Sequence, residues 1–168
     1  MEGTPVESKG SQESHVADLA GKYLAFALGQ EEYGLPVLKV REIIKVMDIT
    51  QVPQVPAHVR GVINLRGKVI PVIDLRTKFG LARAEYNDQT CIIVVDVMLS
   101  GSRVMMGIVV DSVSEVLNIA GADLDEPPDF GGRVTTDYIL ALAKVKGSVK
   151  ILLDLDRVLG ADIQTAVF

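Results

Sequence analysis

Short apolar runs separated by polar turn residues dominate the chain from residue 22 onward. Residues 23–28 and 33–37 flank a polar break, which is the pattern of a β-hairpin. Pro36 has no amide donor, so we expect it to end the second strand or to start a short helical turn through Val40. Residues 41–47 then predict a further strand.

The same pattern returns after a proline-punctuated loop. Residues 61–66 and 69–73 are rich in Val and Ile, and Gly67-Lys68 between them predicts the turn of a second hairpin. Asp74 is expected to cap a short helix, and Gly80 to follow its end.

Two segments recur, in the same order, in the second half of the chain. Residues 34–46 align without gaps on residues 107–119 with four identities, and residues 67–80 align on residues 147–160 with five. This indicates a duplicated unit of about 70 residues, with roughly five short strands in each copy. Five short strands favour a small barrel that closes its own edges, so the sequence predicts a mainly β protein of two linked barrels.

Composition supports this fold class. Val and Ile together make up 37 of the 168 residues, and β-branched side chains favour strands over helices. The longest stretch without Asp, Glu, Lys or Arg has 11 residues, against about 20 for a membrane-spanning helix. Residues 1–21 are polar and lack the apolar run of a secretory signal, so we expect a disordered N-terminal tail on a cytoplasmic protein.

Charge is distributed unevenly along the chain. The net charge is −5, which argues against general affinity for nucleic acid. Residues 57–83 carry six basic side chains and one acidic one, whereas residues 84–168 carry six basic and thirteen acidic ones. The basic centre fits either a solvated surface or a contact with an acidic protein partner.

Residues for catalysis are scarce. His15, His58 and Cys91 are the only histidines and the only cysteine, so neither a His-based triad nor a three-His zinc site can be assembled. We therefore favour an interaction module without a cofactor over an enzyme. The alternative is a small-ligand-binding β-barrel or an enzyme, whose carboxylates would have to converge in a cleft; its candidates are Asp111, Asp154 and Asp156.

Residues 33–44 and 59–80 closely resemble the CheW family of chemotaxis coupling proteins, through the string Gly-Val-Ile-Asn-Leu-Arg-Gly followed by Pro-Val-Ile-Asp-Leu-Arg. Residues 107–117 resemble the second half of that family. The resemblance covers residues 22–160 and implies two five-stranded, SH3-like barrels with short helices. We assign one barrel to residues 22–35 and 41–80 with C-terminal elements, the other to residues 90–150, and a C-terminal tail to residues 161–168.

The resemblance also implies a function. Proteins of this family are adaptors that join the cytoplasmic tips of methyl-accepting chemoreceptors to the regulatory domain of a CheA-type histidine kinase. The chain is thus expected to be a cytoplasmic, non-enzymatic scaffold recruited to receptor arrays at the membrane, without inserting into it. An adaptor of the same kind in a sensory pathway other than motility is equally compatible with the sequence.

Carried onto this chain, the family's kinase-binding positions are Val40 and Gly61, and its receptor-binding positions are Glu42, Asn64, Leu65 and Arg66. A glycine at a strand start permits close approach by a partner, and a neighbouring exposed valine offers an apolar anchor. Glu42 and Arg66 can pair with each other or present opposite charges to a receptor helix, and the two alternatives are compatible. Of Val62 and Ile63, only one can face outward.

Overall fold

The computed structural model describes residues 16–129 and 136–165, which are mainly β-strand as predicted. One sheet has the spatial order β8 (Ser112–Ile119), β1 (Gly21–Leu28), β2 (Glu31–Pro36), β11 (Ser148–Leu153), β10 (Ile139–Val145) and β9 (Leu124–Asp125). The other has the order β3 (Val40–Lys45), β6 (Cys91–Leu99), β7 (Ser102–Val110), β5 (Lys68–Asp74) and β4 (Val59–Leu65). The helical elements are η1 (Val37–Lys39), α2 (Leu75–Lys78), η2 (Gly121–Asp123) and α3 (Leu155–Thr165).

Each sheet encloses its own apolar interior. We call the sheet of β3–β7 barrel one; its buried interior consists of Ile63, Leu65, Ile70, Val72, Ile92, Val94 and Val109. The sheet of β1, β2 and β8–β11 is barrel two; its buried interior consists of Tyr23, Ile119, Leu124, Ala141, Ala143 and Leu152. The two interiors are small because alternate residues of several strands face the opposite way, toward the other barrel.

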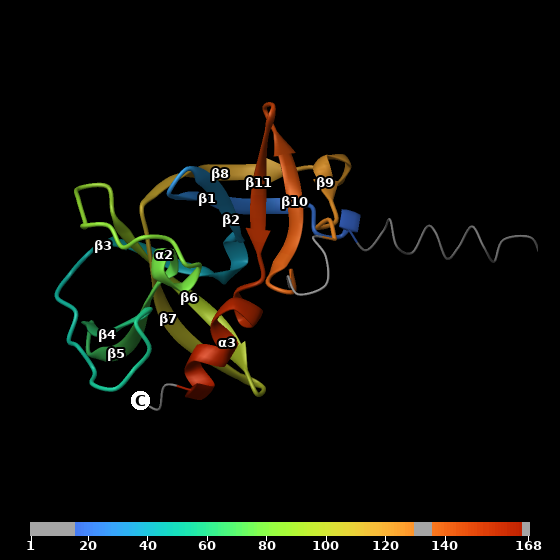
Figure 1. Cartoon of the computed structure of the whole chain (residues 1–168). Coiled ribbons are helices and arrows are strands. Elements are labelled where there is room, and N and C mark those ends of the chain that lie inside the picture. Colours follow the sequence, from blue (N-terminus) through green and yellow to red (C-terminus); the bar gives the residue numbers. More distant parts are fainter. Residues whose placement is uncertain (1–15, 130–135, 166–168) are drawn as a thin grey trace, which may run out of the picture.

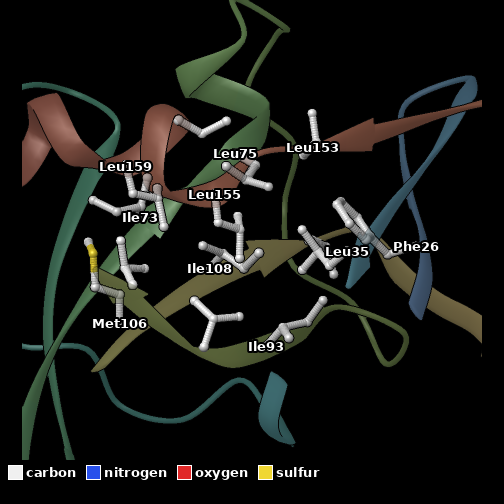
Figure 2. Packing of buried hydrophobic residues seen from close by; sticks show 14 of the residues in the cluster. Phe26, Leu35, Ile73, Leu75, Ile93, Met106, Ile108, Leu153, Leu155 and Leu159 are labelled. Carbon is white, nitrogen blue, oxygen red and sulfur yellow. The ribbon is translucent and has the colours of Figure 1, made fainter. Parts of the chain in front are cut away.

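A larger apolar core lies between the barrels. Phe26 and Leu35 of barrel two meet Ile93, Met106 and Ile108 of barrel one, and all five are almost fully buried. Figure 2 shows these side chains pointing toward one another, with leucines of α2 and α3 closing the same cluster. The barrels therefore share one hydrophobic core.

The strands of the two sequence repeats are distributed between the barrels. Hairpin β1–β2 of the first repeat lies in barrel two, and hairpin β6–β7 of the second lies in barrel one. Figure 1 shows the blue hairpin β1–β2 beside the red strand β11. The joining pairs are parallel: Gly34 lies opposite Leu152, and Gly107 opposite Val72. The sequence alignment makes these two pairs equivalent. Each repeat thus contributes one hairpin to a sheet whose other strands come from the other repeat.

The observed sheets therefore do not follow the predicted division into residues 22–35 with 41–80 and residues 90–150. The difference arises because pairing between strands distant in sequence leaves no local signal, whereas hairpins do. The chain crosses from barrel two to barrel one through η1, and returns where β7 passes into β8 at Asp111.

Both ends of the described chain hold more structure than the predicted tails. Val16 and Leu19 pack against the interior of barrel two, and the Tyr23 hydroxyl donates to the Leu19 carbonyl. At the other end, α3 continues to Thr165, so residues 161–165 are helical. The N-terminal end of the described chain is ordered because Val16 and Leu19 are apolar residues in an otherwise polar segment and become partly buried. Residues 1–15 and 166–168 lie outside the described residues.

Asp74 caps the start of helix α2, as predicted. The Asp74 carboxylate accepts hydrogen bonds from the backbone amides of Arg76 at 3.0 Å and Thr77 at 3.5 Å. It also accepts from the Arg60 guanidinium at 3.2 Å and the Tyr86 hydroxyl at 3.3 Å. Burial, followed by the neighbouring Asp74 carboxylate, raises the pKa of Tyr86. Asp74 thus connects β4, α2 and the segment before β6.

Candidate partner-binding site

Glu42 and Arg66 form an ion pair on barrel one. Glu42 lies in β3 opposite Val94, and Arg66 lies in the turn between β4 and β5. Their side chains are 31% and 70% exposed, respectively, so the guanidinium remains accessible to a partner while it binds the carboxylate. The hydrogen bond to Glu42 raises the pKa of Arg66. Of the two alternatives that the sequence left open, the structure thus contains the ion pair between Glu42 and Arg66.

The turn that carries Arg66 is fixed by its own residues. Arg66 and Gly67 both have positive φ, at 51° and 88°, and they form the two-residue hairpin turn. The predicted turn, Gly67-Lys68, was thus one residue too late, because Lys68 already pairs with Leu65. The Asn64 side-chain oxygen accepts from the Gly67 amide at 2.9 Å. Asn64 therefore stabilises the turn that presents Arg66.

Gly61 is a buried backbone position rather than an exposed one. Its φ is 139°, and a Cβ there would lie 2.0 Å from the Thr50 carbonyl oxygen. Thr50 and Val62 exchange two backbone hydrogen bonds, at 2.8 and 2.9 Å. The close approach that this glycine permits is thus made by a segment of its own chain. The next two residues alternate, with Ile63 buried and Val62 half-buried.

Leu65 points into barrel one. Only 8% of the residue is exposed, and it packs in the same interior as Ile63. The alternation of β4 places residues 61, 63 and 65 on one face, a period that was available in the sequence. Leu65 accordingly supports the hairpin from inside, and Arg66 and Asn64 are the exposed members of the predicted receptor-binding set.

Val40 begins β3, opposite Val95, and is half-buried against the core between the barrels. Beside it, Leu38 of η1 is 96% exposed. Sequence analysis missed Leu38, because an apolar residue between strands reads equally well as core. On the adjacent pair of strands, Arg41 lies 3.5 Å from the Asp96 carboxylate. The start of β3 therefore combines exposed apolar surface with flanking charge.

The three carboxylates considered for a catalytic or ligand-binding cleft are held in separate interactions. Asp111 accepts from Arg76 at 2.6 Å and from the Gly29 amide at 2.7 Å. Asp156 pairs with Lys39 at 3.2 Å, and Asp154 accepts from the backbone amide of Arg157 at 3.3 Å. Each carboxylate thus serves a crossover or a helix start.

Neither a metal-binding cluster nor a membrane-spanning helix is found among the residues that the structure describes. In residues 16–129 and 136–165, no three or more side chains of His, Cys, Asp and Glu are grouped so that they could hold a metal ion. Over the same ranges, every helix is too short or too polar to span a bilayer.

Comparisons with known proteins agree with this architecture. The model of the CheW-like domain matches residues 22–162. A chemotaxis protein CheW of Klebsiella aerogenes is 38% identical over 152 residues, covering 88% of this chain and 89% of that protein. One from Rhizobium meliloti is 32% identical, covering 90% and 96%. The crystal structure of the scaffolding protein TtCheW from Thermoanaerobacter tengcongensis has a TM-score of 0.76 and 32% identity, covering 89% of this chain and 99% of that one.

These matches, together with the two-barrel fold, first define a class of protein: a non-enzymatic scaffold. More narrowly, this chain belongs to the CheW family of chemotaxis adaptors.

Proposed function

We propose that this chain couples the cytoplasmic tip of a transmembrane chemoreceptor to the regulatory domain of a CheA-type histidine kinase, in the cytoplasm beneath the membrane. Family membership supports the role. Two surface features lie on or beside barrel one: the Glu42–Arg66 pair, and the exposed Leu38 of η1 next to the half-buried Val40 at the start of β3. We assign the first to the receptor and the second to the kinase.

The observation that carries the receptor assignment is the state of Arg66. Its guanidinium is held by Glu42 and its backbone by a tight turn, yet its side chain is 70% exposed. A charge fixed in this way binds a partner without the entropic cost of ordering a long side chain. Asn64 serves the same surface by holding the turn, and Leu65 by anchoring it.

The kinase assignment rests on apolar surface. A leucine that is 96% exposed beside the half-buried Val40 offers the kind of anchor that a partner's pocket fills. Gly61 contributes by holding β4 against Thr50, which shapes barrel one.

The receptor contact is tested with Arg66→Glu, measured by calorimetric titration against the isolated cytoplasmic fragment of a chemoreceptor. Lys146→Glu is the matched control, because Lys146 occupies the corresponding turn of barrel two, also with a φ of 51°. We expect at least tenfold weaker binding for Arg66→Glu and wild-type binding for Lys146→Glu. Because an exposed ion pair contributes only about 0–1 kcal/mol, both variants should keep the thermal midpoint of the native protein.

Equal weakening by both variants, or unfolding of Arg66→Glu, would refute the receptor assignment.

For the kinase contact, Leu38→Asp is titrated against the kinase regulatory domain. Leu38 is almost wholly exposed, so this change leaves the core intact. We expect weakened binding, and native affinity would remove the start of β3 from the interface.

A further inference from the structure

The two places where the chain crosses between barrels are fastened in the same way. Arg76 of α2 donates to Asp111 at the β7–β8 crossover, and Asp156 of α3 accepts from Lys39 at the β2–β3 crossover. The repeat alignment places Arg76 and Asp156 at equivalent positions. Both crossovers are therefore held by an ion pair to the same helix position, although the partners differ by one place in the alignment, since Asp111 aligns on Leu38 and not on Lys39.

Asp156 makes a second contact in addition to its ion pair with Lys39. One of its carboxylate oxygens accepts from the Met98 backbone amide at 2.9 Å and lies 3.3 Å from the Lys39 ammonium. At the other crossover the arrangement is reversed: the carboxylate belongs to the crossover residue, Asp111, which also accepts from the Gly29 amide. A single side chain thus connects three elements: α3, the end of β6, and η1.

The element that Asp156 fastens, η1, is a single turn between the buried Leu35 and the half-buried Val40. None of the three residues of η1 is buried, and Pro36, which precedes it, makes no side-chain cap. Its closing backbone hydrogen bond runs from the Val40 amide to the Val37 carbonyl. A single turn with no buried residue of its own opens readily unless a side-chain contact restrains it. Lys39, which supplies that contact, lies directly between Leu38 and Val40.

We propose that Asp156 is a positioning residue for the kinase-binding surface: by fastening Lys39, it fixes η1 so that Leu38 and Val40 are presented in one arrangement. This inference rests on the kinase contact proposed above. Asp156 acts on this surface through Lys39, and it therefore changes affinity by raising the fraction of molecules that are ready to bind. The α3 helix, packed by Leu155 and Leu159 into the core between the barrels, provides the rigid support.

The test is calorimetric titration of the full chain against the kinase regulatory domain. Asp156→Asn removes the charge that holds Lys39, and we expect about five- to tenfold weaker binding, as for a competent state populated a tenth to a fifth of the time. Asp156→Glu keeps a carboxylate and should recover most of the affinity. Asp111→Asn removes the charge that pairs with Arg76 at the other crossover. This variant is the matched control and should bind like the native protein.

Hydrogen exchange of the Val40 amide supplies a readout that a general loss of stability would not mimic. In Asp156→Asn we expect faster exchange at Val40 with unchanged exchange in α2 and an unchanged thermal midpoint, because both members of the ion pair are about one-third exposed. Native affinity in Asp156→Asn, or equal weakening in Asp111→Asn, would overturn the inference.

Leu38→Asp separates the two proposals. If Leu38→Asp weakens kinase binding while Asp156→Asn leaves it unchanged, the kinase contact stands and the positioning role fails. If both variants bind normally, the kinase contact itself is refuted, and the positioning role with it.

Discussion

At the scale of single residues, Gly61 is the glycine whose surroundings leave the least room for a side chain among those described. A methyl group there would collide with the Thr50 carbonyl, and the backbone occupies a φ that L-residues rarely adopt. We expect Gly61→Ala to lower the free energy of unfolding by about 3 kcal/mol or more, since backbone cannot yield as a flexible side chain does. Urea denaturation followed by circular dichroism measures this loss.

Gly67→Ala provides the control for that measurement. Gly67 also has a positive φ, at 88°, but a Cβ there would meet no atom within 4 Å. The substitution therefore isolates the conformational cost, which we expect to be about 1 kcal/mol. Equal losses for the two variants would show that the approach of Thr50 costs nothing.

The residues of the candidate site were only partly predictable from the sequence. Glu42 and Arg66 were foreseen as a possible pair because they carry opposite charges and were assigned to different elements of one barrel, and the structure joins them. The burial of Leu65 follows from alternation along β4, but only once the turn is correctly placed at Arg66–Gly67. The exposure of Leu38 could not be foreseen, because it depends on the path of the chain between two barrels.

At the scale of elements, Asp74 holds the start of α2. Its side chain is nearly inaccessible and binds Arg60, whose side chain is 15% exposed, in addition to two backbone amides of the helix. Asp74→Ala removes the cap and leaves a largely buried guanidinium without its carboxylate. We therefore expect a loss of about 3–5 kcal/mol in the free energy of unfolding, measured by urea denaturation.

Asp154 occupies the equivalent position before α3, so Asp154→Ala is the control for the loss of stability in Asp74→Ala. It accepts from the Arg157 amide at 3.3 Å, and its other partner, the Arg157 side chain, is 62% exposed. Asp154→Ala should cost about 1 kcal/mol, the usual value of a helix cap. A loss for Asp74→Ala no greater than this would mean that the Arg60 contact adds nothing.

The elements themselves were largely predictable from sequence. Hairpins and the cap at Asp74 carry local signals in turn residues and periodicity, so β1–β2, β4–β5 and α2 appear close to where they were expected. The parallel pairings of β2 with β11 and of β5 with β7 carry no such signal. The repeat was therefore recognised correctly, while the way in which its strands divide between the barrels was not.

At the scale of the whole molecule, the exchange of hairpins makes the repeats depend on each other. Each barrel draws strands from both halves of the chain, and both halves contribute to the core between the barrels. We expect fragments 1–83 and 84–168 to be largely unfolded alone and to recover native β-structure when mixed one to one, because the break falls between elements. Circular dichroism and gel filtration follow this recovery.

A folded fragment in either half would contradict that expectation, since it would show that one repeat can complete a barrel without the other's hairpin. Intact chain should correspondingly unfold in one transition, with the same midpoint for near- and far-ultraviolet signals.

The shared core also determines how this adaptor can carry mechanical displacement. Tilting one barrel against the other would pull Phe26 and Leu35 away from Ile93 and Ile108, and so open the best-buried region of the molecule. Such a body behaves as a stiff spacer: a push on one surface moves the opposite surface by the same amount and in the same direction. On the function proposed above, a receptor and a kinase bound to opposite surfaces would therefore be held at a constant spacing.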